Sequence, residues 1–145
     1  MSYRFNSMVA VMRNSIQTHK KNCSVPGNKF CFQVLSLMRA QGLICGFHLD
    51  LAERKKTWQG YPRYNIYLKY KNFNEPIIKK MKIYKNTKSN FYFININKKI
   101  IDPLKKKRLF VINTKIGLQM LSVENFILLY KNKKFRGKLI LELNI

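Results

Sequence analysis

The stretch Arg108–Gln119 reads RLFVINTKIGLQ, and it decides how the second half of the chain folds. Its apolar run, Leu109–Ile112, contains no Gly or Pro, and a short run of this kind predicts a buried strand. The polar segment Asn113–Lys115 follows and offers an amide, a hydroxyl and an ammonium group. Gly117 then permits a positive φ or the close approach of another backbone. Such a strand end can present hydrogen bonds to a partner, but an ordinary strand-to-helix loop has the same local pattern.

The composition of the whole chain favours a binding role for this polar segment. The 145 residues include 29 Lys and Arg against 6 Asp and Glu, which gives a formal net charge of +23. Self-repulsion at this charge opposes compact folding unless an anionic partner neutralises it. Nucleic acid is the first partner that the charge indicates, and an anionic membrane surface is the second. Hydrophobic residues make up 46% of the chain, so the protein can bury a core and is not a disordered basic tail.

The same composition indicates the kind of genome that encodes the chain. It contains 22 Lys, 15 Asn and 15 Ile but only 3 Ala. Lys, Asn and Ile have codons rich in A and T, so the bias is typical of an AT-rich genome such as that of an organelle. Part of the positive charge can therefore reflect codon drift rather than contacts with a partner.

The thiols and acids form no recognisable metal or catalytic motif. Cys23, Cys31 and Cys45 are odd in number and lack a CxxC pair, and His19 and His48 are the only histidines. These spacings predict no zinc site and no cofactor, but three buried or half-buried free thiols in a reducing compartment. The six acids are scattered and give no DxD-like pair or HExxH motif that could hold a catalytic metal.

The sequence shows no membrane segment or export signal. No apolar run approaches the length of a membrane span, and the N-terminus lacks the hydrophobic region of a signal peptide. Residues Ser2–Ile16 are amphipathic, with two Arg and no acid, which faintly resembles a transit peptide. Because their apolar face continues into a folded pattern, we expect this segment to be part of the domain.

Hydrophobic periodicity predicts a first helix and an extended segment at the start of the chain. Apolar residues of Phe5–Ile16 recur at helical spacing, and Arg13 and Asn14 lie off this stripe near the C-terminal end of the helix. A solvated Arg near a helix C-terminus is as good a local explanation for Arg13 as contact with RNA. The short extended piece Ser24–Lys29 follows and is interrupted by Pro-Gly.

The second helix has clear start and stop signals in the sequence. Asn28 is placed to cap it, and Gly42 stands where a glycine commonly ends a helix. Its expected buried stripe consists of Phe30, Val34, Leu37 and Met38. Lys29 and the free backbone N–H groups at the helix start can bind a phosphate, although a plain capped helix shows the same pattern. The alternating segments Leu43–Leu51 and Tyr64–Tyr70 then predict a β-hairpin.

The second half of the chain is predicted to consist mostly of strands. Strand-like runs occur at Ile77–Ile83 and Phe91–Ile96, and a basic turn, Lys105–Arg108, precedes the apolar run of the opening stretch. Ser122 is placed to cap one further helix, and Lys138–Leu143 forms a last strand. The fold class is therefore α+β. An N-terminal α/β half (helix-strand-helix-strand-strand, residues 1–72) packs against a β-rich C-terminal half with one helix (residues 73–145).

Five short segments, in their order and spacing, resemble those of a known family. Met12-Arg13-Asn14 resembles Ile-Arg-Asn, Val25–Lys29 resembles Val-Pro-Ser-Ser-Lys, and Leu68-Lys69-Tyr70 resembles Leu-Lys-Tyr. Ile112–Leu118 resembles the signature Val-Ser-Thr-Ser-Lys-Gly-Val, and Arg136–Ile140 resembles the closing Gly-Gly-Glu-Leu-Leu. Together these segments resemble the small-subunit ribosomal protein eight family nearly end to end. Within the signature, Thr114 and Gly117 are identical, whereas Asn113, Lys115 and Ile116 depart from it.

The resemblance implies a non-catalytic protein that binds rRNA. Members of the family have an N-terminal α/β half and a β-rich C-terminal half, and they bind the central domain of small-subunit rRNA as early assembly proteins. Tyr92 is our assignment for the family's RNA-facing tyrosine. The residues that we expect to contact RNA are Arg13, Asn14, Asn28, Lys29, Tyr92, Lys106, Asn113, Thr114, Lys115 and Gly117.

The sequence therefore predicts a structural constituent of the small subunit of a mitochondrial ribosome. Its expected partners are small-subunit rRNA and neighbouring small-subunit proteins, with no membrane and no homo-oligomer, and a plastid location is less favoured. The alternative is an RNA-processing enzyme or nuclease of an organelle. The scattered acids, and histidines without a nucleophile partner, argue against that alternative.

Overall fold

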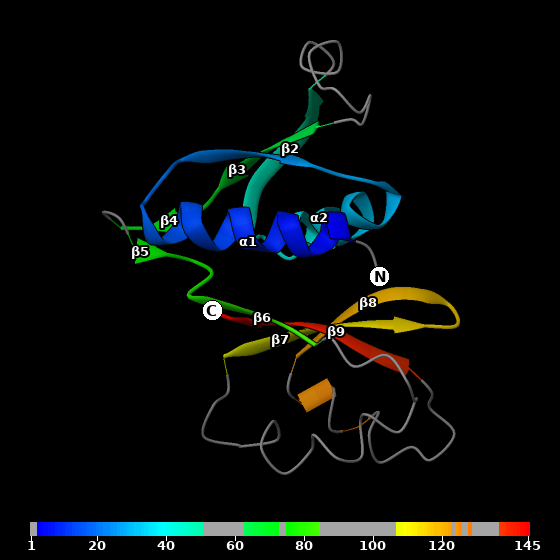
Figure 1. Ribbon diagram of the computed structural model, residues 1–145. Helices are drawn as coiled ribbons and strands as arrows, with labels where there is room; N and C mark the ends of the chain where they lie inside the picture. The colour runs from blue at the N-terminus through cyan, green and yellow to red at the C-terminus, as the bar shows by residue number, and fades with distance from the viewer. Residues whose placement is uncertain are drawn as a thin grey trace. The chain divides into compact units, whose positions relative to one another are not determined.

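The computed structural model divides the chain into two compact units, Met1–Lys79 and Lys80–Ile145 (Figure 1). It describes residues 3–50, 63–72, 75–84, 107–122, 124–125, 128 and 137–145. The division follows Lys79, whereas the sequence analysis places the boundary after residue 72. The described helices and antiparallel strands confirm the predicted α+β class. The aromatic run Phe91–Ile96 lies outside the described residues.

The first unit consists of two helices and a three-stranded antiparallel sheet, with one further short strand pair. Its elements are α1 (Tyr3–Gln17), β1 (Asn22–Pro26), α2 (Lys29–Ala40), β2 (Ile44–Asp50), β3 (Arg63–Leu68), β4 (Tyr70–Lys71) and β5 (Glu75–Pro76). In the sheet, β3 lies between β1 and β2 and is antiparallel to both. Helix α1 packs along β1, and α2 packs along β2. This order confirms the predicted helix-strand-helix-strand-strand arrangement.

Each helix of the first unit buries one apolar stripe. The fully buried side chains of α1 are Phe5, Met8, Val9 and Met12, as the periodicity predicts. Those of α2 are Cys31, Val34, Leu35 and Met38, so the predicted stripe is wrong for Phe30 and Leu37. The buried face is rotated about the helix axis from the predicted one. Phe30 instead packs edge-on against Phe5, with ring centroids 5.1 Å apart.

Both ends of α2 follow the signals in the sequence. Asn28 is extended, and its side-chain Oδ1 accepts a hydrogen bond from the Cys31 N–H at 3.0 Å. Gly42 has a φ of 73°, and the Leu43 N–H donates to the Met38 carbonyl at 2.9 Å. These are the features of a Schellman motif with glycine at its left-handed position. The predicted cap and the predicted terminal glycine are both confirmed.

A bulge in β2 decides which of its residues face the core. The pairing of β2 with β3 shifts register between Ile44 and Gly46, so Cys45 is the extra residue. As a result Leu43 and Ile44 are both buried, whereas Cys45 is exposed. The prediction of three buried or half-buried thiols is therefore wrong for Cys45. All three thiols are free, and Cys31 is buried and Cys23 half-buried, as predicted.

The second unit contains a four-stranded antiparallel sheet. Its strands are β6 (Lys80–Ile83), β7 (Arg108–Thr114), β8 (Gly117–Ser122) and β9 (Gly137–Asn144), in the order β6-β9-β7-β8. Because β7 pairs on both edges, its apolar run is enclosed, and Phe110, Val111 and Ile112 are fully buried. The predicted strand Ile77–Ile83 is only partly correct, because β6 begins at Lys80.

The segment that follows the polar tip is a strand. Residues 117–122 form β8, which returns antiparallel to β7 (Figure 1), so Lys115 and Ile116 make a two-residue hairpin turn. The interpretation as a strand-to-helix loop is therefore wrong. All six residues of β8 are half-buried. Its sequence, GLQMLS, has two adjacent apolar residues, Met120 and Leu121, and so lacks the strict polar–apolar alternation by which a strand is recognised.

The start of the helix predicted after Ser122 agrees with the described residues there. Glu124, Asn125 and Leu128 are helical. The Asn125 N–H donates to the Ser122 Oγ at 3.4 Å, which is the contact expected of an N-cap.

Candidate nucleic-acid interface

The hairpin turn between β7 and β8 is closed by Thr114. Thr114 pairs with Gly117 in the register of the two strands. Its Oγ1 donates to the Gly117 carbonyl at 2.9 Å and accepts from the Ile116 N–H at 3.3 Å. A hydroxyl has one hydrogen and two lone pairs, so one lone pair remains for an outside donor. Thr114 therefore supports the turn itself, and any contact with a partner uses its remaining acceptor capacity.

The tip of this hairpin is open to a partner. Asn113, Lys115 and Ile116 are exposed, and Ile116 has 90% of its surface accessible. Gly117 has a φ of 132°, which disfavours side chains, and no atom lies within 4 Å of where a Cβ would stand. The sequence analysis did not include Ile116 among the contact residues. Its position between the polar residue Lys115 and Gly117 was the available signal, because side chains in a tight turn commonly face solvent.

Two predicted contact residues, Asn28 and Lys29, lie at the start of α2. Arg4 of α1, which the sequence analysis did not select, is near them. Asn28 is half-buried and uses its Oδ1 for the cap, and Lys29 is exposed. Burial raises the pKa of the Cys31 thiol, while a hydrogen bond with the Asn28 backbone and the charge of Arg4 act in the opposite direction. Arg4 of α1 is therefore close enough to add positive charge to this helix start.

The other predicted pair lies at the opposite end of α1. Arg13 is half-buried and Asn14 is exposed. Phe5 contacts Phe30 at the start of α2, and Arg13 is eight residues further along α1, or about 12 Å at the rise of an α-helix. The first unit therefore carries two separate predicted contact positions rather than one cluster.

Two predicted contact residues, Tyr92 and Lys106, lie outside the described residues. Arg108, from the same predicted basic turn as Lys106, is instead the first residue of β7 and is buried, so the predicted turn is wrong for this residue. Its Nη1 lies 2.9 Å from Oε1 of Glu142 on β9. The Tyr84 hydroxyl donates to Oε2 of Glu142 at 2.7 Å. Arg108 thus neutralises a buried carboxylate and is not available to a nucleic acid.

The described part of the chain contains no group of three or more His, Cys, Asp or Glu that could hold a metal ion. No helix among the described residues is both long and apolar enough to cross a membrane.

Exposed amides and cations at a hairpin tip and at helix ends, on a chain with a net charge of +23, define a basic nucleic-acid-binding protein. Residues 4–122, most of the chain, match the model of the family described as ribosomal protein S8. The chain belongs to the ribosomal protein S8 family. It is therefore a structural protein of the small ribosomal subunit and not the nuclease that the sequence left as an alternative.

Individual relatives agree with the family match. The chain is 27% identical over 120 residues to small ribosomal subunit protein uS8m of Dictyostelium discoideum, covering 81% of this chain and 72% of the relative. It is 32% identical over 71 residues to small ribosomal subunit protein uS8 of Solibacter usitatus, covering 49% of this chain and 50% of the relative.

Proposed function

We propose that the protein is a component of the small subunit of a mitochondrial ribosome, where it binds the central domain of the small-subunit rRNA during assembly and translation. Its partners are this rRNA and neighbouring small-subunit proteins, and it acts as a single copy. The similarity to the uS8m protein of Dictyostelium and the AT-rich coding bias support the mitochondrial assignment.

The observation that carries the proposal is the geometry of the β7–β8 turn. Lys115 is exposed at the tip and can neutralise a phosphate, and the exposed amide of Asn113 can bond a 2′-hydroxyl in a minor groove. Gly117 leaves open space beside the turn for an RNA backbone. The remaining lone pair of Thr114 can accept from a 2′-hydroxyl. These groups read the shape of an RNA helix rather than a long base sequence.

The first unit adds electrostatic contacts in this proposal. Arg13 and Asn14 contact the RNA at one end of α1, and Asn28 and Lys29 contact it at the start of α2. The free N–H groups of the first turn of α2 favour an anion, and Lys29 adds a full charge beside them. Tyr92 and Lys106 remain contact residues in the proposal on the basis of the sequence.

The test is a salt titration of binding to a transcript of the central domain of the mitochondrial small-subunit rRNA, with an unrelated structured transcript as competitor. The logarithm of the affinity should fall by roughly 0.7 to 0.9 per phosphate contact for each log unit of salt. We expect Lys115→Gln to weaken binding and to reduce the magnitude of this slope by about the amount that one phosphate contact contributes.

The matched control is Lys79→Gln, which removes a charge that lies 3.9 Å from Glu75 and is half exposed. The slope for this control should stay close to that of the wild type. Equal affinity for the two transcripts at every salt concentration would contradict specific rRNA binding. Equal effects of the two lysine variants would remove the assignment of Lys115 to a phosphate.

A further inference from the structure

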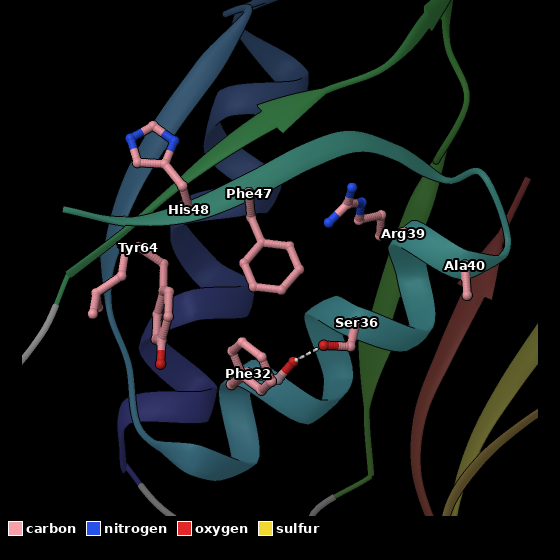
Figure 2. Close-up of a pocket in the computed structure, with 8 residues that line it drawn as sticks. Phe32, Ser36, Arg39, Ala40, Phe47, His48 and Tyr64 are labelled. Carbon is pink, nitrogen blue, oxygen red and sulfur yellow. Dashed lines mark hydrogen bonds between the residues drawn. The ribbon is translucent and has the colours of Figure 1, made fainter.

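An open groove lies between α2 and the edge of the sheet in the first unit (Figure 2). Its volume is about 520 Å³. Helix α2 contributes Phe32, Ser36 and Arg39, and the strands contribute Phe47, Leu49 and Tyr64. The core does not close this groove: Phe32 is 48% exposed and Leu49 is 38% exposed. None of the expected rRNA contact residues lies in its lining.

Three aromatic rings form the floor of the groove. The Phe32 and Phe47 centroids are 5.5 Å apart, and Tyr64 lies 6.3 Å from Phe32 and 6.1 Å from Phe47. In Figure 2 the Phe47 ring points from β2 towards Phe32. Gly27 leaves room for the Tyr64 ring, because a Cβ at residue 27 would overlap that ring.

His48 is next to the groove but does not contribute its ring to the floor. In Figure 2 its imidazole points away from Phe47. It stacks on Tyr67 with centroids 5.5 Å apart and an angle of 28° between the rings. This reflects the alternation of side chains along β2, which places His48 and Phe47 on opposite faces of the sheet.

Cations stand at both ends of the aromatic floor. Lys29, Phe32, Ser36 and Arg39 follow one another at spacings of three, four and three residues, which places them on a single stripe of α2. Lys29 and Arg39 are therefore about 15 Å apart along the helix, with Phe32 between them. Both are exposed, and neither forms an ion pair within the described part of the chain. No Asp or Glu is among the described residues that line the groove.

We propose that this groove binds an unpaired RNA base, which stacks on the Phe32 ring while the phosphates of the same strand lie beside Lys29 and Arg39. The inference rests on the proposed function, because it takes RNA as the partner. Aromatic rings between two cations fit single-stranded nucleic acid, since every base has a face that can stack and every linkage carries a negative charge. A hydrophobic segment of a neighbouring protein would use the rings but would leave both cations without a counter-charge.

The test compares binding of two fluorescent probes to the full chain: a short single-stranded oligoadenylate, and an RNA duplex of the same length. Phe32→Leu keeps an apolar side chain but removes the ring, and Phe32→Tyr keeps the ring. We expect Phe32→Leu to weaken oligoadenylate binding by about tenfold, Phe32→Tyr to leave it within about twofold, and neither variant to change duplex binding. Tyr67→Leu is the matched control, because Tyr67 is 40% exposed and lies on the other face of the sheet. It should bind both probes as the wild type does.

Photocrosslinking of the wild type to an oligonucleotide that carries 5-iodouridine gives a readout independent of any variant. The expected crosslinks are to Phe32, Phe47 or Tyr64. Crosslinks elsewhere, together with normal oligoadenylate binding by Phe32→Leu, would overturn the groove assignment and leave rRNA binding by the hairpin intact. A Phe32→Leu variant that binds both RNAs normally but no longer joins small subunits would also overturn it, in favour of a protein partner. Absence of binding of any RNA by the wild type would refute the proposed function together with this inference.

Discussion

Thr114 supports the β7–β8 turn, and it is also one of the residues that we propose to contact RNA. Its hydroxyl hydrogen goes to the Gly117 carbonyl, and one of its lone pairs accepts from the Ile116 N–H. A substitution of Thr114 removes hydrogen bonds within the turn as well as any contact that the hydroxyl makes with RNA. The two roles therefore have to be separated by measuring stability and affinity on the same variants.

We expect Thr114→Ala to lower both melting temperature and affinity for the cognate rRNA fragment, with an affinity loss of about 1 to 3 kcal/mol. Thr114→Ser retains the hydroxyl and should lose little of either. Thermal melting and binding to cognate and unrelated RNA, measured for both variants, check this. If Thr114→Ala melts early but binds the cognate fragment normally when folded, the threonine only supports the turn.

Glu142 supplies the counter-charge for the buried guanidinium of Arg108. Arg108 and Glu142 have only 10% and 9% of their side-chain surfaces exposed, and the Tyr84 hydroxyl occupies the second carboxylate oxygen. Breaking such a pair from one side leaves a buried charge without its counter-charge. The exposed pair of Lys79 and Glu75 is a natural comparison within the same chain.

Glu142→Gln should destabilise the protein by about 3 to 5 kcal/mol, because Arg108 stays charged in a buried position. Glu75→Gln should cost less than about 1 kcal/mol, because both members of that pair are in solvent. Urea unfolding of the two variants measures the difference. Similar costs for the two would show that water or other groups compensate Arg108 in the folded state.

At the scale of elements, the two helices end with the same hydrogen bonds but with different residues. In α1 the Lys20 N–H donates to the Ser15 carbonyl at 2.9 Å. His19, the residue just before Lys20, has a φ of 55°. In α2 the equivalent left-handed position is Gly42. A residue with a Cβ is disfavoured in this conformation by roughly 1 to 2 kcal/mol. Helix α1 therefore ends with a strained residue where α2 does not.

His19→Gly should raise the stability of the protein by about 1 kcal/mol, since glycine removes the strain and its extra chain entropy offsets part of the gain. Gly42→Ala is the reciprocal variant and should destabilise by a similar amount. Chemical denaturation with both variants checks the pair. If His19→Gly is neutral or destabilising, the ring contact of His19 with Tyr70, at 6.4 Å between centroids, contributes more than the backbone strain costs.

At the scale of the whole molecule, the net charge of +23 is the dominant property. Ion pairs can do little to offset it, because the chain has 6 acids against 29 Lys and Arg. Arg108–Glu142 and Lys79–Glu75 are two such pairs among the described residues. The free protein therefore folds against its own repulsion, and bound RNA relieves it.

Raising the sodium chloride concentration from about 0.05 to 0.5 M should raise the melting temperature of the free protein, because salt screens the repulsion among lysines. A short polyphosphate at low salt should produce a larger rise, because it binds the folded state. Calorimetry in the two conditions checks both effects. A melting temperature that falls with salt would show that attractive charge pairs dominate the folded state.

The sequence by itself determined the elements whose signals are local. The stripe of α1, the Asn28 cap and Gly42 at the end of α2, and the buried run of β7 are all as predicted. Each depends on residues within a few positions of one another, so periodicity and capping chemistry suffice. The α+β class follows from these elements, and the order of its motifs was enough to indicate the family.

Only the tertiary structure decided features that depend on distant parts of the chain. The bulge at Cys45 exists through the register of β2 on β3, and β8 is a strand because β7 offers it an edge. Arg108 is buried because Glu142, far from it in sequence, meets its charge, while the Tyr84 hydroxyl donates to the second oxygen of that carboxylate. The aromatic groove likewise needs α2 beside β2 and β3 to bring its rings together. These outcomes are set by long-range pairing and burial, which no local pattern of residues encodes.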